Sequence, residues 1–193
     1  EPIKSDDEYR SGAKVWFTPT LGGKPLQPLS IDLVVDEVDG LAPEVLKPAD
    51  RLDIDGLPVF DYPIYRAECA LADKLLAMLE THNGRPSSRV KDLVDAVVYA
   101  KACEIDSAIL VERVAKEAAT RKVELPKAFA IPASWFENYE ASYKKMAKQA
   151  KADDVAPNLE NAQELARKLY EPAFEGHRDH AKWNPGSMRW VEE

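Results

Sequence analysis

The segment from Tyr62 to Ala100 constrains this chain most, because it combines helical apolar periodicity with a few isolated charges. Apolar residues recur at helical spacing over residues 65–80 and again over residues 89–103, which predicts two amphipathic helices joined by a loop with Gly and Pro. Ser87 or Ser88 is expected to cap the second helix. Charged side chains are rarely buried without partners, so the isolated charges of this segment indicate a polar site: Lys74, Asp92 and Asp95.

The residues before this segment have strand character. Residues 13–36 predict a β-hairpin with its turn at residues 21–25, and residues 59–63 predict one more short strand. In this interpretation, residues 1–64 form a region of small antiparallel sheet.

The residues after this segment predict three further helices. Asp106 is expected to cap the first of them, and Asn158 is expected to cap the last. Between them, residues 135–146 carry an aromatic stripe at helical spacing, which we interpret as core rather than as a platform for stacking bases. Strands first and helices afterwards predict an α+β protein whose residues 65–193 form a helical bundle.

Charge and hydropathy exclude some classes of protein. The net charge of −8 argues against a wholly basic nucleic-acid-binding protein but leaves room for a local basic cleft. No apolar run approaches the roughly 20 residues that a membrane-spanning helix needs. The polar opening differs from a secretory signal, and Cys69 and Cys103 are interpreted as reduced core residues, so we expect a cytoplasmic protein.

The second predicted helix carries a narrow polar strip. At about 100° per residue, Asp92, Asp95 and Tyr99 fall within roughly 60° of one another, and valine and leucine fill much of the remainder. Such a strip faces either solvent or a polar cleft. On the solvent side, the acids would interact with the positive N-terminus of the helix, and Lys91 would pair with Asp95.

Lys74 lies on the first predicted helix between Ala70 and Ala77, which leave room for the lysine to reach another element. An ammonium group is a compact charge suited to a triphosphate, and a neighbouring acid could orient it. The simpler alternative is a surface lysine that pairs with Asp73 or with another nearby acid.

Weaker signals come from three other groups of residues. Asp32 is an acid among apolar residues of the second predicted strand. Carboxylates are common on the exposed faces of strands, but strand carboxylates also hold Mg²⁺ against substrate phosphates in polymerase-type enzymes. Arg85, Arg89 and Lys91 form a basic cluster that suits a triphosphate or an RNA backbone, or else a solvated helix start. Two histidines lack a well-placed third ligand and do not predict a metal site: His177 and His180.

The combined pattern resembles the AbiEii-type nucleotidyltransferase toxins, a family that includes the MenT toxins. The resemblance lies in Tyr62-Pro63, in ALADKLLAML and in RVKDLVDAVVYA, and it continues through Leu125-Pro126 to Trp183-Asn184-Pro185 and Trp190. It covers nearly the whole chain, and its most specific part is the section Lys…Arg-x-Lys-Asp-x-x-Asp.

The resemblance implies transfer of a nucleotide from an NTP to an acceptor, with Mg²⁺ as cofactor. Lys74 matches the family's functional lysine, which is expected to contact the triphosphate, and the later essential aspartate falls at Asp92, with Asp95 as the alternate. Asp32 matches the third strand carboxylate of the wider superfamily and is a candidate ligand of the metal. In the MenT branch the acceptor is the 3′ end of tRNA, which blocks translation, and the toxin is paired with an antitoxin.

One motif of the family is not found in the sequence. A Gly-Gly/Ser turn and an Asp-x-Asp strand are expected upstream, but Gly22-Gly23 lies inside the predicted hairpin and Asp53-Ile54-Asp55 lacks a preceding glycine turn. Because this motif is not found, the resemblance implies that residues 1–64 are an incomplete catalytic domain and that the chain is inactive alone. The chain also opens on Glu1, so we expect it to be part of a longer protein. The alternative is a non-catalytic helical module that binds RNA or an antitoxin.

Overall fold

A computed structural model describes residues 10–36, 41–47, 54–56, 58, 60–82, 84–176 and 180–192. The contacts divide the chain into two units, Glu1–Asp39 and Gly40–Glu193, and each is described by itself. Asp53, His177 and Val59 lie outside the described residues, so the Asp-x-Asp sequence, the histidine pair and the start of the strand predicted over residues 59–63 are not described.

The described part of the first unit is a long antiparallel strand pair, with a second, very short strand pair at the turn that connects its strands. β1 (Arg10–Phe17) pairs with β4 (Leu29–Asp36), and the connection between them holds the two-residue strands β2 (Thr20–Leu21) and β3 (Lys24–Pro25). Gly22 and Gly23 turn the chain at φ values of 57° and 77°, which favour glycine because it has no Cβ. The hairpin predicted over residues 13–36 and its turn are confirmed.

The two faces of the long strand pair differ in polarity. Val15 lies opposite Ile31 and Phe17 opposite Leu29, so one face is apolar. Lys14 lies opposite Asp32 on the other face. The alternation therefore places Asp32 on the polar face, beside a lysine.

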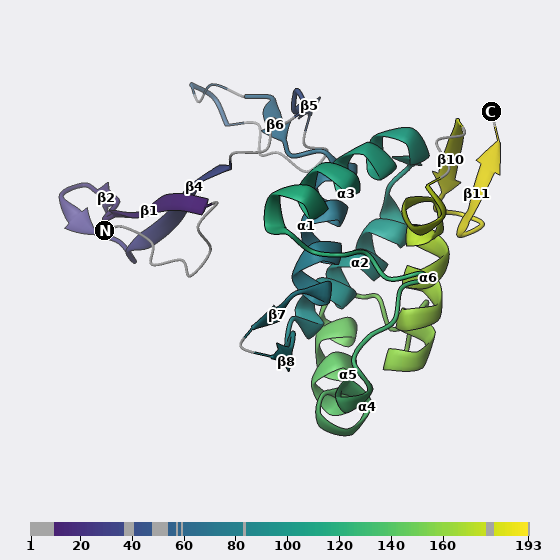
Figure 1. The fold of residues 1–193 in the computed structure, drawn as a ribbon. Coiled ribbons are helices and arrows are strands. Elements are labelled where there is room, and N and C mark those ends of the chain that lie inside the picture. The colour runs from purple at the N-terminus through teal and green to yellow at the C-terminus, as the bar shows by residue number, and fades with distance from the viewer. Residues whose placement is uncertain are drawn as a thin grey trace. The chain divides into compact units, whose positions relative to one another are not determined.

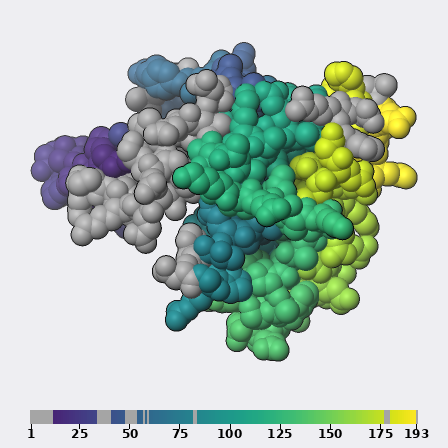
Figure 2. All heavy atoms as spheres, in the orientation of Figure 1, coloured from purple at the N-terminus to yellow at the C-terminus, as the bar shows by residue number. Residues whose placement is uncertain are grey.

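The second unit contains six helices within the residues that the structure describes (Figure 1): α1 (Ala67–Leu79), α2 (Val90–Ala102), α3 (Ser107–Arg121), α4 (Ala133–Asn138), α5 (Glu140–Gln149) and α6 (Leu159–Glu175). α1 packs against α2 and α3, α6 packs against the same two helices, and α5 packs against α2. On the face that Figure 2 shows, the segments that carry α3 to α6 meet in one continuous packed surface. The apolar side chains of the six helices form the core, which includes Leu71, Leu75, Leu93, Leu110, Trp135 and Leu169.

Short strands connect or extend the helices of this unit. β5 (Glu44–Leu46) pairs with β6 (Tyr62–Ile64), and β7 (Thr81–His82) pairs with β8 (Arg85–Pro86). Near the C-terminus, β9 (Ile105–Asp106), β10 (Ala181–Asn184) and β11 (Arg189–Glu192) form a sheet in the order β11-β10-β9. β5 was not predicted, because it is held by pairing with β6, which lies well after it in the sequence. The C-terminal hairpin was not predicted either, because it is held by pairing with β9 and by packing of its tryptophans.

Two of the predicted helix caps are confirmed and one is wrong. The carboxylate of Asp106 accepts a hydrogen bond from the backbone N–H of Ile109 at 3.1 Å, and the side chain of Asn158 accepts one from Asn161 at 2.9 Å. α2 instead begins after Arg89, which makes no capping hydrogen bond with its side chain. The hydroxyl of Ser87 donates to the carbonyl of Ala77 in α1 at 2.7 Å and accepts from the backbone N–H of Arg89 at 3.2 Å, so this serine joins α1 to the residue that precedes α2.

The single helix predicted over residues 135–146 is wrong, because the structure divides it into α4 and α5 at Tyr139, whose φ and ψ are −124° and 0°. Both flanking aromatic residues are fully buried with their polar atoms bonded. Trp135 Nε1 donates to the carbonyl of Ser87 at 2.7 Å, and the Tyr143 hydroxyl donates to the carbonyl of Ala156 at 2.8 Å. The prediction that this stripe is core is confirmed.

The C-terminal residues are held by two tryptophans. Trp183 is fully buried and its Nε1 donates to the carbonyl of Ala100 at 2.7 Å, while Trp190 Nε1 donates to Lys168 at 3.0 Å. The predicted α+β class is confirmed by the small antiparallel sheets near the N-terminus and the helices that follow. In the described part of the chain, no helix has both the length and the apolar character for crossing a membrane.

Candidate functional site on α1 and α2

Lys74 lies in the middle of α1 and reaches across to α2. Its Nζ donates a hydrogen bond to Asp95 Oδ2 at 2.7 Å and lies 3.6 Å from Asp92 Oδ1. The side chain of Lys74 is only 20% exposed and that of Asp95 is 24% exposed. Lys74 therefore pairs with nearby acids, as the simpler alternative also expected, but its partners lie on a neighbouring helix and its side chain is half-buried rather than on the surface.

Helical geometry explains why the two acids converge on one lysine. Asp92 and Asp95 are separated by one turn of α2, so both side chains project from the side of α2 that faces α1. Asp92 is buried, and Asp95 lies closer to the edge. The polar strip predicted for this helix is thus confirmed, and it faces the neighbouring helix α1.

Two further cations, both more exposed than Lys74, complete the cluster. Arg89 Nε donates to Asp92 Oδ2 at 2.6 Å, and Lys91 Nζ donates to Asp95 Oδ2 at 2.8 Å. The side chains of Arg89 and Lys91 are 62% and 74% exposed. Three cations therefore share two carboxylates, which leaves one positive charge in excess at the edge of the cluster.

The environment keeps both members of the central pair charged at neutral pH. Burial alone would lower the pKa of Lys74, but its hydrogen bond to Asp95 and the charges of Asp95 and Asp92 raise that pKa above its usual range. Burial alone would raise the pKa of Asp95, but hydrogen bonds from Lys74 and Lys91 hold it below the usual range of a carboxyl group. Burial also raises the pKa of Tyr99, which therefore stays neutral beside them.

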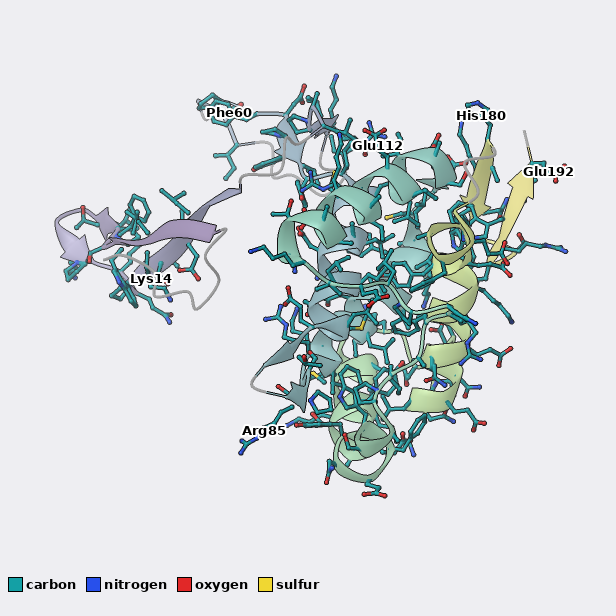
Figure 3. All side chains as sticks on the ribbon, in the orientation of Figure 1. Lys14, Phe60, Arg85, Glu112, His180 and Glu192 are labelled. Carbon is teal, nitrogen blue, oxygen red and sulfur yellow. The ribbon has the colours of Figure 1, made fainter. Side chains whose placement is uncertain are left out.

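Of the other predicted site residues, Arg85 lies outside this cluster, and Asp32 belongs to the other unit and is described by itself. Arg85 belongs to β8, where its side chain is exposed and points away from the helices (Figure 3). Asp32 belongs to the first unit, where its Oδ1 lies 3.3 Å from Lys14 Nζ and its side chain is largely exposed. The cluster that the structure brings together therefore consists of five residues of α1 and the start of α2: Lys74, Arg89, Lys91, Asp92 and Asp95.

The described residues do not fit the magnesium site that the resemblance implies. Among them, no group of three or more His, Cys, Asp or Glu side chains is placed to hold a metal ion. The carboxylates of Asp92 and Asp95 are already bonded to cations, and Asp32 is paired with Lys14. Because Mg²⁺ is usually held by one or two carboxylates together with waters and substrate phosphates, the obstacle here is that each candidate carboxylate is already paired with a cation.

A second charged group, which the sequence did not predict, lies on α3 and packs against a different side of α1 from the one that carries the Lys74–Asp95 bond. Arg113, Glu117 and Arg121 repeat every four residues on α3, and all three are buried. Arg121 bonds to Asp73, the residue directly before Lys74. The signal in the sequence was the spacing of alternating charges on a helix whose other inward positions are apolar.

The fold and the cluster together define an α+β protein in which three cations and two carboxylates meet on α1 and α2. The chain belongs to a family of nucleotidyltransferase toxins, because residues 1–175 match the family described as "Nucleotidyl transferase AbiEii toxin, Type IV TA system". This match confirms the resemblance that the sequence indicated. Searches among curated proteins and among solved structures find no match.

Proposed function

We propose that Lys74 binds the triphosphate of an NTP during nucleotidyl transfer, and that Asp95 orients its ammonium group. The observation that carries this proposal is the 2.7 Å hydrogen bond between a half-buried Lys74 and Asp95. An ammonium group has three donors, so one bond to Asp95 leaves others for phosphate oxygens. Family membership supports the same reaction class.

The geometry favours different roles for the two aspartates. The resemblance placed the essential aspartate at Asp92, with Asp95 as the alternate. Asp95 is the direct acceptor from Lys74, whereas Asp92 lies farther away and accepts from Arg89. We therefore assign the orienting role to Asp95, and we propose that Asp92 holds Arg89 at the edge of the triphosphate site.

The exposed cations extend the proposed site outward. Arg89 and Lys91 are largely exposed and sit beside the two aspartates, so both can turn toward a bound polyphosphate. In the reaction, the hydroxyl oxygen of the acceptor forms a new bond to the α-phosphorus and its proton passes to water, while the bond between the α-phosphorus and the oxygen that bridges to the β-phosphorus breaks to release pyrophosphate. The cations would stabilise the negative charge of the leaving pyrophosphate. Arg85 stays a prediction for contact with the acceptor, because its side chain projects outward.

The proposed identities of the acceptor, the partner and the cofactor come from the family resemblance. We propose tRNA as the acceptor and a cognate antitoxin as the partner, which places the reaction in the cytoplasm, where NTPs and tRNA occur. Mg²⁺ and its candidate ligand Asp32 stay predictions, because the described residues do not form a metal site. The same holds for the assignment of residues 1–64 to the catalytic region and residues 65–193 to a helical domain.

The test measures nucleotide binding first and transfer second, since the chain is expected to be inactive alone. Each of the four NTPs is titrated against the wild-type chain and against Lys74→Met, and transfer of α-label to total tRNA is measured with Mg²⁺. Lys101→Met is the matched control, because Lys101 donates to Asp154 at 2.7 Å at the other end of α2. We expect Lys74→Met to weaken binding at least tenfold and Lys101→Met to leave it unchanged. Equal affinities for the wild type and Lys74→Met would contradict the proposal.

The missing Asp-x-Asp motif favours the non-catalytic alternative for this chain by itself. A helical module that binds RNA or an antitoxin would bind its partner without NTP. Retention of RNA or antitoxin binding in Lys74→Met, together with no NTP binding by the wild type, would favour this alternative.

A further inference from the structure

α3 buries a row of alternating charges against α1. Arg113, Glu117 and Arg121 have side chains only 3%, 1% and 1% exposed. Glu117 joins the two arginines, accepting from Arg113 Nη2 at 2.7 Å and from Arg121 Nε at 3.0 Å. Burying charged groups carries a large desolvation cost, and apolar residues of similar volume are often as stabilising. Packing alone therefore does not explain this row.

Arg121 holds α1 at two points. Its Nη2 donates to Asp73 Oδ1 at 2.7 Å, and its Nη1 lies 3.5 Å from Glu80 Oε1. Asp73 and Glu80 are about two helical turns apart, and Glu80 is the residue that ends α1. A rigid, planar guanidinium bonded at two points along a helix fixes both the rotation of that helix and its position along its axis.

The second oxygen of Asp73 is held by the same group of residues. The hydroxyl of Tyr65 donates to Asp73 Oδ2 at 3.2 Å and accepts from Arg113 Nη2 at 3.0 Å. Both oxygens of this carboxylate therefore have partners fixed by α3, one directly and one through Tyr65. The carboxylate of Asp73 has little freedom to move without breaking several bonds.

Asp73 and Lys74 are adjacent in the sequence but bond to different helices. Successive side chains of a helix differ in direction by about 100°, so a residue that faces α3 is followed by one that faces α2. Asp73 contacts Arg121 on α3, and Lys74 contacts Asp95 on α2. A rotation of α1 that releases Asp73 therefore also changes the position of Lys74 relative to Asp95.

We propose that Arg121 is a positioning residue that holds Lys74 against Asp95 by fixing the rotation of α1. The proposal rests on the proposed function of Lys74, because only a lysine with a task at this place requires such a fixed orientation. Apolar contacts between α1 and α3 hold the helices together but are non-directional. The directional bonds of Arg121 supply the orientation that those contacts lack.

The test measures the state of Lys74 directly, without nucleotide. The rate of acylation of Lys74 by a small amine-reactive reagent is followed by mass spectrometry across a pH series, which reports the pKa of its ammonium group. The variants are Arg121→Met, which removes the charge, and Arg121→Lys, which keeps the charge but loses the two-point bond. Val114→Ala is the matched control, because Val114 is fully buried on the same helix and its truncation lowers stability without touching the ion pairs.

We expect Arg121→Met to lower the pKa of Lys74 by about one unit, which makes its acylation about tenfold faster at a fixed pH below that pKa. Arg121→Lys should show a smaller change, and Val114→Ala should leave the pH profile unchanged. An unchanged profile in folded Arg121→Met, or an equal shift in Val114→Ala, would overturn the proposal. If Arg121→Met does not fold, Glu80→Gln decides the question, because it removes one of the two anchors and should shift the profile in the same direction.

NTP binding separates this proposal from the proposed function. If the acylation profile shifts in Arg121→Met but Lys74→Met binds NTP like the wild type, the positioning of Lys74 is correct and its role in triphosphate binding is wrong. If Lys74→Met loses NTP binding while Arg121→Met changes neither acylation nor affinity, the proposed function stands and the positioning role is refuted.

Discussion

The bond between Lys74 and Asp95 makes a measurable prediction about stability. We expect a double-mutant cycle with Lys74→Met, Asp95→Asn and the double variant to give a coupling free energy of about 1–1.5 kcal/mol. Hydrogen bonds to charged groups contribute about 1.5–3 kcal/mol, whereas exposed ion pairs contribute only about 0.2–1 kcal/mol. This pair lies between these limits, because both side chains are half-buried and Lys91 shares the same carboxylate oxygen at 2.8 Å.

The coupling depends on pH in a direction that the structure fixes. The pKa of Asp95 is lowered in the folded chain, so its contribution is present above the ordinary carboxyl pKa of about 3.9 and is lost as the pH falls through the lowered value. The pKa of Lys74 is raised, so its contribution is present below the ordinary value of about 10.4 and is lost as the pH rises through the raised value. The coupling should therefore be constant from about pH 5 to pH 9 and decrease outside this range.

Urea unfolding followed by circular dichroism measures the four free energies of unfolding in this cycle. The same cycle at Lys101 and Asp154 is the control, because that pair has a hydrogen bond of the same length, 2.7 Å, but involves an exposed aspartate. Its coupling should be smaller than that of Lys74 and Asp95. The reasoning fails if the two cycles give equal couplings, or if the coupling of Lys74 with Asp95 is the same at pH 3 and pH 7.

Three further variants test how the second unit is held together, each by urea unfolding. Asn158→Ala removes the N-cap of α6 and should lower the free energy of unfolding by about 1 kcal/mol, whereas Asn158→Asp should restore most of the loss. Trp183→Phe leaves the carbonyl of Ala100 without its donor and should cost roughly 2–4 kcal/mol; a cost under about 1 kcal/mol would show that this bond does not hold the C-terminal hairpin. Gly176→Ala places a Cβ at φ 70° after α6 and should cost about 1 kcal/mol, and no loss would mean that the helix end relaxes.

Local signals in the sequence predicted the elements better than their interactions. The caps at Asp106 and Asn158 were predictable because a cap depends on the few residues that follow it. The division between α4 and α5 was not, since the spacing of aromatic residues continues across Tyr139. Burial of Trp135 beneath the start of α2 comes from tertiary packing, which periodicity does not report.

The candidate site shows the same limit. The polar strip on α2 and the reach of Lys74 were predictable from helical geometry, because both follow from angles around one helix axis. The sequence favoured Asp92 over Asp95, and only the relative position of α1 and α2 shows that Asp95 is the direct partner of Lys74. Ser87 was misassigned for a similar reason, because its partner Ala77 lies on another helix.

Asp73 and Lys74 place opposite charges on two sides of one helix, and this arrangement links the two clusters into one system. Arg121 attracts the acid toward α3, and Asp95 attracts the lysine toward α2, so both bonds resist rotation of α1 in either direction. In the proposed function, Lys74 keeps its bond to Asp95 and offers its other donors to phosphate oxygens. The pull of a bound polyphosphate on the ammonium group would then act on α1 through Lys74 alone, and the bond from Arg121 to Asp73 on the other side of the helix would oppose it.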